Sequence, residues 1–343
     1  MDRRDFLKSS GAAAVAVGTA AAPASDASAA PPAPALASGV REVRLAVHGG
    51  PGLPGQGAER LAHAIETALE GRWRIGLVEG GAGAELDFGS AHRHARLHPA
   101  FALFAGLPCG QGLDAGRLHT WLVAGGGGML WEELGAGFGF RPLAVGHTGP
   151  SQGLWAAARL ETPADFAGAR LHVEGLAADS VAALGASPLQ VAAAEVRSAL
   201  SDGRLAGAEW LGALAEIAPD LQPPAQRLYA PGINRAGALL SLAVSRSLWE
   251  AMSTGERAVL EACAAREHQL SLADAHAHAL IAAEAAAPAK WPVRLPFPAE
   301  VAARLERAAA EAVERAGDAD AEARRILDSY RGFRRLSAGA FLA

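Results

Sequence analysis

The stretch that decides the fold is residues 165–210, which read DFAGARLHVEGLAADSVAALGASPLQVAAAEVRSALSDGRLAGAEW. Short apolar runs predict three strands in it, and apolar residues at helical spacing predict a helix between each pair of strands. In chain order, these five elements are expected at 170–174, 176–184, 189–192, 195–200 and 206–210. Strands that alternate with helices in this way form parallel sheets, so the stretch predicts an α/β fold.

Four side chains that are able to contact a ligand stand at the ends of the first and last of these strands. Ligands of parallel α/β sheets bind outside the carboxyl ends of the strands. The stretch therefore predicts a cleft at this edge of the sheet, lined by His172, Glu174, Glu209 and Trp210.

Length, charge and cysteine content narrow the class of protein. A chain of 343 residues, half of them hydrophobic, is long enough for two domains with large cores. The formal net charge of -5 and the lack of a basic patch with interleaved aromatic residues argue against a nucleic-acid partner. Cys109 and Cys263 have no neighbouring cysteine, so two buried thiols are expected rather than a disulfide, which an oxidising compartment would still permit.

The amino-terminal segment has the features of an export signal. Arg3 and Arg4 precede an apolar run of small residues, and the small residues at 27–29 fit a cleavage site. We expect residues 1–29 to be a twin-arginine-type signal peptide that directs the chain to the periplasm. The Pro- and Ala-rich residues 30–39 are expected to form a disordered linker.

Further strands extend the α/β pattern on both sides of the central stretch. They are expected at 43–47, 72–78, 85–88, 142–145, 238–244 and 293–297. The first of them runs into a glycine-rich turn, where the backbone N–H groups of His48 and Gly49 are placed to hold an anion. The turn matches neither the GxGxxG nor the Walker pattern, so it does not predict a nucleotide site.

A long helix is predicted after Ser253. Ser253 and Glu256 fit a capping box, and no residue interrupts the helical pattern from there to residue 287. This is roughly thirty residues, or about 48 Å at 1.5 Å per residue, which is longer than one lobe needs. We therefore expect it to bridge two lobes, and we expect amphipathic helices in 298–335 to permit a homodimer.

His92, His94 and His98 form an H-x-H-x3-H pattern. On a strand the first two would share a face, as in a zinc site, whereas Arg93 and Arg96 beside them would repel a cation and favour a solvated loop. The scattered histidines also leave open a periplasmic metal-dependent or hydrolytic enzyme, although no nucleophile elbow or zinc signature occurs. The histidines considered for that alternative are His48, His92, His94, His147 and His172.

Several short motifs occur together along the chain. Residues 99–104 read PAFALF, 121–131 contain WL, GGGG and LW, 147–149 read HTG, and 207–210 read GAEW. In this combination the chain resembles the solute-binding proteins of tripartite ATP-independent periplasmic (TRAP) transporters, of the DctP-type family, and among them the members that bind α-keto acids. The resemblance implies a two-lobe periplasmic-binding-protein fold, in which each lobe is a mixed sheet flanked by helices and a long helix bridges both lobes.

The resemblance also implies how the chain divides between the lobes. Lobe 1 is expected at 40–145, with a later segment, about 235–290, that returns to it, and lobe 2 is expected at 146–234. Bridging helices are expected at 245–287, and a C-terminal strand and helices at 288–343. The ligand would then lie in the cleft between the lobes.

Several positions depart from the family's ligand-site pattern. The arginine with which the family grips the substrate carboxylate falls at His172, and a neutral imidazole cannot make the charged, bidentate contact of an arginine. The family's Asn is His147, and the glutamine that helps to hold a metal is Ser151, with Gln152 shifted by one. Arg235 is expected as a displaced anion clamp.

The resemblance therefore implies a binding protein rather than an enzyme. It would capture a small organic acid, such as a carboxylate, or a related solute and deliver it to TRAP membrane permease subunits. No cofactor is expected apart from a calcium or sodium ion that can accompany the ligand and would use Glu209 and Gln152. If the ligand is a carboxylate, a protonated His172 would bind it more tightly at pH 6 than at pH 8. The expected ligand-binding residues are His48, Gly49, His147, Ser151, Gln152, His172, Glu209, Trp210, Asn234 and Arg235.

Overall fold

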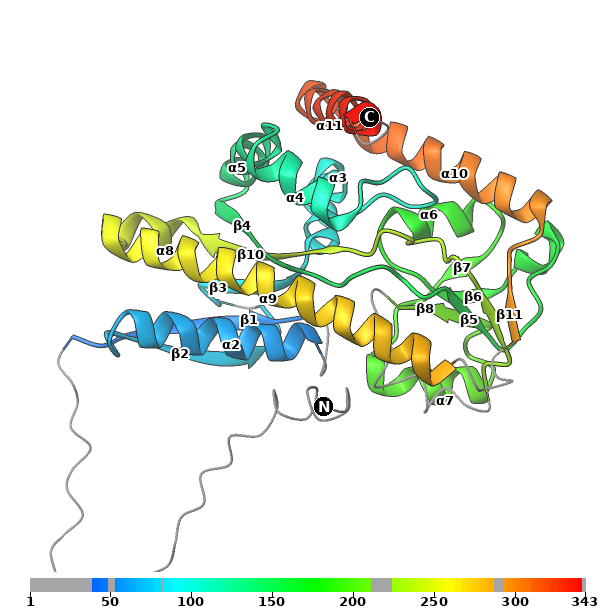
Figure 1. The fold of residues 1–343 in the computed structure, drawn as a ribbon, viewed down its shortest axis with the longest axis horizontal. Coiled ribbons are helices and arrows are strands. Elements are labelled where there is room, and N and C mark those ends of the chain that lie inside the picture. The colour runs from blue at the N-terminus through cyan, green and yellow to red at the C-terminus, as the bar shows by residue number, and fades with distance from the viewer. Residues whose placement is uncertain (1–38, 49–52, 82, 211–223, 287–292, 341–343) are drawn as a thin grey trace, which may run out of the picture. The chain divides into compact units, whose positions relative to one another are not determined.

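The structure is a computed structural model that describes residues 39–48, 53–81, 83–210, 224–286 and 293–340. The expected signal peptide, most of the expected linker and Gly49 lie outside the described residues. Figure 1 shows that the described chain forms two β-sheets with helices packed around them. None of the helices in this part of the chain is long and apolar enough to cross a bilayer.

The first sheet has five strands in the order β2-β1-β3-β10-β4. β1, β2 and β3 run parallel, whereas β10 is antiparallel to both β3 and β4. Six of the seven residues of β10 are buried, as is typical of a strand covered on both faces. The five strands predicted here are confirmed, with ends shifted by at most two residues. They are β1 (Arg41–Val47), β2 (Trp73–Glu79), β3 (Leu86–Ser90), β4 (Phe140–His147) and β10 (Leu239–Ser245).

The second sheet has six short strands in the order β11-β9-β5-β8-β6-β7. β6 pairs in parallel with β7 and β8, as predicted, while β5 is antiparallel to β8 and β9. The strands are β5 (Leu154–Ala156), β6 (Arg170–His172), β7 (Ser187–Pro188), β8 (Gly207–Glu209), β9 (Arg227–Tyr229) and β11 (Val293–Leu295). The two predicted helices of this region are α6 (Leu176–Ala182) and α7 (Val196–Ser201).

The strand predicted at 189–192 is wrong. β7 ends at Pro188, and the Leu189 N–H still donates to the Leu171 carbonyl of β6 at 2.9 Å, but the pairing stops there. The Val191 N–H donates to the ring of His172 at 3.3 Å, and the Gln190 side chain donates to the Val173 carbonyl at 2.8 Å. These contacts between side chain and backbone end the strand pairing early and hold the segment beside β6.

Two short connections between the sheets contact each other. One joins β4 to β5 through residues 148–153, and the other joins β9 to β10 through residues 230–238. The Thr148 N–H donates to the Ala238 carbonyl at 2.9 Å, and the Ala238 N–H donates to the Thr148 hydroxyl at 2.8 Å. Gly237 has φ +76°, and a Cβ there would lie 1.7 Å from a carbonyl oxygen of the other connection, so only glycine fits. We call these two segments the crossing connections.

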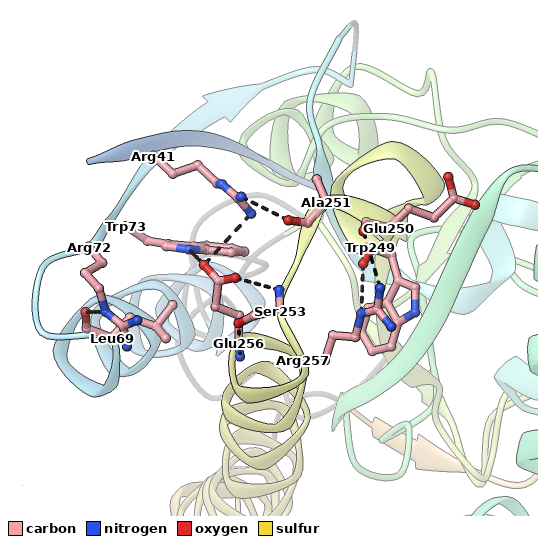
Figure 2. A network of polar contacts seen from close by, with 10 residues as sticks. All are labelled: Arg41, Leu69, Arg72, Trp73, Trp249, Glu250, Ala251, Ser253, Glu256 and Arg257. Atoms are coloured by element: carbon pink, nitrogen blue, oxygen red, sulfur yellow. Dashed lines mark hydrogen bonds and ion pairs between the residues drawn. The ribbon is translucent and has the colours of Figure 1, made fainter. Parts of the chain in front are cut away.

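The predicted long helix is α9 (Thr254–Ala286), with 33 residues. Its capping box is confirmed: the Glu256 N–H donates to the Ser253 hydroxyl at 3.2 Å, and the Ser253 N–H donates to the Glu256 carboxylate at 2.8 Å. Figure 2 shows that Glu256 also accepts a 2.7 Å bond from the indole N–H of Trp73. This bond ties the start of α9 to β2.

Along its length, α9 packs against α2 (Leu53–Ala68), β4 and the first crossing connection. Arg60 of α2 donates to the buried Glu267 of α9 at 2.6 Å. Ala275 lies against Gly149, where an added Cβ would be 2.9 Å from the Ala275 Cβ. The helix thus contacts both the first sheet and the point where the chain leaves it, as expected of a bridging helix.

The predicted amphipathic helices at the C-terminal end are α10 (Ala299–Gly317) and α11 (Ala321–Ala340). Their apolar faces belong to the chain's own core. Tyr330 of α11 packs edge-on against Trp121, and its hydroxyl accepts a 2.6 Å bond from the Leu113 N–H. The amphipathic pattern is therefore explained within one chain and does not by itself indicate a homodimer.

Cys109 and Cys263 are free, buried thiols that lie in different core clusters, which confirms the prediction. Burial raises the pKa of Cys109 to about 12. The thiolate form is therefore scarce at neutral pH, and we assign this residue a packing role.

Candidate functional site

Residues that follow strands of both sheets line a cavity of about 380 Å³. His48 follows β1 and Ser90 ends β3 in the first sheet, while Glu174 and Trp210 follow β6 and β8 in the second. These positions are at the carboxyl ends of parallel strands, the edge where a cleft was predicted. The described residues that line the cavity are His48, Ser90, His92, Arg93, Thr148, Glu174, Gly175, Gln190, Trp210 and Leu240.

An arginine that was not predicted as a ligand contact lies at the cavity. Arg93 donates through Nη1 to one carboxylate oxygen of Asp87, and His48 Nε2 lies 3.2 Å from the other oxygen. Burial pushes the pKa of Asp87 upward, but hydrogen bonds from His48 and Arg93 outweigh it and lower this pKa to about 2. Asp87 is therefore ionised, and it positions the Arg93 guanidinium and the His48 ring at the cavity wall.

His172 supports the cavity wall and does not act as an ionic clamp. Only 2% of its surface is exposed, and its ring stacks on the Trp210 indole with centroids 4.9 Å apart. Its Nδ1 accepts a bond from the Val191 N–H, so the proton of the neutral ring sits on Nε2. Burial lowers the pKa of His172 below its ordinary value, which disfavours the charged ring at pH 6. The lowered pKa opposes the expected gain in affinity at pH 6 through a protonated His172, which stays a prediction.

Glu174 brings a carboxylate to the cavity without a cationic side chain beside it. Its side chain is 34% exposed, and the ion-pair partner nearest to it in the described residues is His172, whose Nε2 lies 3.9 Å away. Because that ring is neutral, the contact does not compensate the charge of a carboxylate. Burial raises the pKa of Glu174. A bound molecule with N–H or O–H donors would supply the missing partner.

His92 reaches the same cavity from the first sheet. Its residue is 7% exposed, and neither ring nitrogen has a hydrogen-bond partner within the described part of the chain. Burial lowers the pKa of His92 to about 4, so the ring is neutral, with one N–H donor and one acceptor nitrogen. The ring lies against Gly175, where a Cβ would be 2.3 Å from it and where φ is +64°. Glycine at this position lets the two sheets approach each other at the cavity.

The suggested metal pattern of His92, His94 and His98 is not a strand. The first two residues lie in a short 3-10 helix, η1 (Ala91–Arg96), which Ser90 caps through its side chain. His94 stacks on Phe140, with ring centroids 4.7 Å apart. No group of three or more histidine, cysteine or acidic side chains in the described ranges is placed to hold a metal ion. The zinc hypothesis and the metal-dependent enzyme therefore gain no support.

Glu209 lies beneath the cavity wall and is fully buried. Its two carboxylate oxygens accept bonds from the backbone N–H groups of Ile233 and Asn234, at 2.9 and 2.8 Å, and the Ser151 hydroxyl also bonds to it. Burial raises the pKa of Glu209, and these donors oppose that rise. Each oxygen already accepts one N–H donor, and a carboxylate oxygen has a second lone pair, so a cation site built on Glu209 and Gln152 stays a prediction.

Among the described residues, the other predicted ligand residues, His147, Ser151, Gln152, Asn234 and Arg235, do not line the cavity. His147 is buried, and its Nδ1 accepts a 3.0 Å bond from the Gly149 N–H. The Asn234 side chain donates to the Glu174 carbonyl at 3.3 Å, which makes it a support of the Glu174 loop. Arg235 pairs with Glu306 of α10 at 3.4 Å and does not line the cavity, where Arg93 lies; the expected anion clamp stays a prediction.

The cavity residues that were not predicted as ligand contacts are Ser90, His92, Arg93, Thr148, Gly175, Gln190 and Leu240, although His92 was considered for a metal site. A signal for three of them was present. The strand-end rule that selected Trp210 also applies to β3, which ends at Ser90 and leads directly into His92 and Arg93. Gln190 carried no such signal, because it lay inside the strand predicted at 189–192, whereas β7 ends at Pro188.

Comparison with known proteins supports the resemblance. A family model described as bacterial extracellular solute-binding protein, family 7 (DctP), matches residues 117–318. A model of the twin-arginine translocation signal sequence matches residues 1–24, so the chain carries a signal for export to the periplasm. A curated relative, the monocarboxylate 2-oxoacid-binding periplasmic protein of Nostoc sp., is 27% identical over 208 residues. The alignment covers 56% of this chain and 56% of that relative, so the match spans about half of each.

Solved structures confirm the two-lobe fold. TRAP periplasmic solute-binding proteins of Pseudoalteromonas atlantica and Colwellia psychrerythraea each match with a TM-score of 0.81, and each match covers 89% of this chain and 97% of the other. Sequence identity is 20% and 19%, and the two proteins were crystallised with sodium and pyruvate and with calcium and pyruvate, respectively. The family model describes binding proteins and not enzymes, and it matches more than half of the sequence. The chain belongs to family 7 of the bacterial extracellular solute-binding proteins, the DctP family.

Proposed function

We propose that this protein captures a small organic acid in the cavity between its two sheets and delivers it to the membrane subunits of a TRAP-type transporter. The observation that carries the proposal is the cavity itself, which both sheets line and which has a volume of about 380 Å³. Small-molecule sites typically enclose about 300–1,000 Å³ and combine apolar walls with a few polar groups. The names of the relatives, which include 2-oxoacid and pyruvate binders, support an acid as the ligand.

Arg93 is the side chain that we assign to the carboxylate of the ligand. A guanidinium has five N–H donors, and the contact to Asp87 uses only Nη1, which leaves other donors for a second carboxylate. Asp87 fixes the guanidinium in place, so little side-chain freedom is lost when the ligand binds. Trp210, stacked on His172, supplies the aromatic wall on the side of the second sheet.

Ligand capture in this proposal does not depend on a resident ion. Calcium prefers six to eight oxygen ligands, but both carboxylate oxygens of Glu209 already accept backbone N–H groups. The sodium and calcium in the two structural neighbours are properties of those proteins. We expect the ligand affinity of this protein to change less than about threefold when calcium or sodium is replaced by a chelator and potassium.

Closure of the lobes around the ligand would use the crossing connections. Residues 148–153 and 230–238 are two of the segments through which the chain passes between the sheets, with 146–234 as the expected second lobe. A few residues of this kind absorb the backbone rotation when two domains close on a ligand. The closed form is the state that we propose for docking to the permease. A homodimer would need a surface other than the buried faces of α10 and α11.

A thermal-shift screen of the exported form, residues 30–343, tests the proposal. Ligand at about 100 times its dissociation constant stabilises a protein by about 2.7 kcal/mol, which raises the unfolding midpoint by about 5–10 °C. We expect such a shift with at least one class of small acid. Arg93→Lys should weaken binding by about tenfold or more, because lysine cannot make the forked contact, whereas the surface variant Arg204→Lys should not. No shift with any acid, or equal losses in both variants, would refute the proposal.

A further inference from the structure

The charges around the cavity do not suit an acid alone. Asp87 and Arg93 are both charged and paired with each other, so together they contribute little net charge. Glu174 adds a carboxylate from the other sheet, and within the described residues no arginine or lysine pairs with it. The family's arginine position is occupied by His172, and burial lowers the pKa of its ring, which favours the neutral form. A carboxylate ligand therefore finds one cationic group in the cavity and one uncompensated acidic group.

Hydrogen-bond acceptors that lack a partner gather near Glu174. The acceptor nitrogen of the neutral, buried His92 ring is one, and the Glu174 carboxylate oxygens, which are partly exposed to solvent, accept no hydrogen bond from the described side chains. His92 is more than nine-tenths buried, and its ring touches Gly175, the residue next to Glu174. A buried polar group without a partner costs roughly 1–3 kcal/mol, so the ligand is the expected source of the missing donors. Trp210 adds an aromatic surface of the kind that attracts organic cations.

We propose that the ligand is a zwitterion, an organic acid that also carries a protonated amino group, with Arg93 holding its carboxylate and Glu174 accepting its ammonium N–H bonds. The proposal rests on the proposed function and names the chemical class that the same cavity selects. Arg93 comes from the first sheet and Glu174 from the second. A molecule with both charges would contact the two sheets at once, and it would favour the closed form for that reason.

An α-keto acid lacks the N–H donors that this arrangement requires. Its carbonyl oxygen would face the Glu174 carboxylate, acceptor against acceptor, and the unpaired histidine nitrogen would stay unpaired. Sites built to bond an N–H or O–H group reject analogues without it by large factors, up to about 10⁴. Since Glu174 is partly exposed to solvent, we expect a smaller preference, of about 100-fold, for the amino form over the keto form.

Calorimetric titration with matched pairs of acids tests this inference. Each pair differs only at the second carbon: alanine and pyruvate, leucine and 4-methyl-2-oxopentanoate, phenylalanine and phenylpyruvate, glutamate and 2-oxoglutarate. We expect at least one amino acid to bind about 100-fold more tightly than its keto partner. Glu174→Gln should remove most of this preference, with weaker amino-acid binding and stronger keto-acid binding. The gain for the keto acid cannot arise from misfolding, so the variant is informative even if it is less stable.

Glu311→Gln, an exposed substitution on α10, is the matched control and should leave both affinities unchanged. If the keto acid of each pair binds better than the amino acid, or if Glu174→Gln leaves the preference intact, the zwitterion inference is wrong while the proposed function stands. If no member of any pair binds, this inference fails, whereas the proposed function fails only if no acid in the thermal-shift screen binds either.

Discussion

Removal of the Glu209 carboxylate tests whether this residue supports the fold or contacts the ligand. Its two oxygens accept the N–H groups of Ile233 and Asn234, and the side chain is fully buried. In Glu209→Ala both N–H groups lose their partner, at about 1–3 kcal/mol each, so we expect a loss of about 3–5 kcal/mol in the free energy of unfolding. Glu209→Gln keeps one acceptor oxygen, and its loss should be about 1–3 kcal/mol.

The assay is thermal unfolding without ligand, followed by calorimetry with ligand. For a chain of this size, each kcal/mol lowers the midpoint by about 2–4 °C, so Glu209→Ala should unfold about 10 °C below the wild-type protein. The exposed Glu300→Ala should shift it by less than about 2 °C, because surface ion pairs contribute little. Affinity of the folded fraction should fall only modestly in Glu209→Gln, since Glu209 does not line the cavity.

The reasoning is refuted if Glu209→Ala unfolds at the same temperature as Glu300→Ala. It is equally refuted if both Glu209 variants keep their stability but lose ligand binding together with a response to calcium or sodium. That outcome would restore Glu209 as a ligand or cation contact, as the resemblance to the family implied.

Three further predictions concern the crossing connections and the titratable groups. Gly237→Ala should lower the free energy of unfolding by about 3 kcal/mol or more, because Gly237 has a positive φ and a Cβ there would lie 1.7 Å from a carbonyl oxygen. Gly332→Ala on α11, where a Cβ would have no atom within 4 Å, should raise it by about 0.5 kcal/mol. Thermal unfolding checks both. Asp87 has a pKa of about 2 instead of 3.8, so it contributes about 2 kcal/mol to the free energy of unfolding, present above pH 3.8 and lost as pH falls through 2. Denaturant melts of Asp87→Asn should show this deficit at pH 7 and little of it at pH 2. His172→Gln should leave the slope of affinity between pH 6 and pH 8 unchanged, because burial already keeps the ring neutral, and a flatter slope in the calorimetric titrations of the variant would contradict this.

Local sequence patterns predicted most of the fold because its elements are locally encoded. The α9 capping box and the apolar strands β1 and β10 depend on residues within a few positions of each other, and the structure confirms them. The same rule placed Glu174 and Trp210 at the cavity, since a strand end determines where the next side chains lie. The strand predicted at 189–192 failed because a ring nitrogen of His172 competed for the Val191 N–H, which a local pattern cannot reveal.

The parts of the site that the sequence did not predict depend on contacts between distant residues. Arg235 and Arg93 are equally plausible anion partners in the sequence, and the choice is made by Glu306 and Asp87, which neutralise them in different places. Glu209 ends a strand in the same way as Trp210, but the loop that carries Ile233 folds back onto its carboxylate. Charge and burial of this kind are set by tertiary packing, so the ligand chemistry could be argued only from the structure.

The central claim is that a solute binds in the cavity between the two sheets. Calorimetric titration of the exported form with the best ligand of the thermal-shift screen, in the wild-type protein, Trp210→Ala and Trp249→Ala, tests it most directly. Trp210 lines the cavity, while Trp249 is not among its lining residues and lies near the start of α9 (Figure 2). We predict one site per chain, with affinity reduced about 30-fold or more in Trp210→Ala and unchanged in Trp249→Ala. Equal affinity in all three proteins, or no saturable binding in the wild-type protein, would contradict the claim.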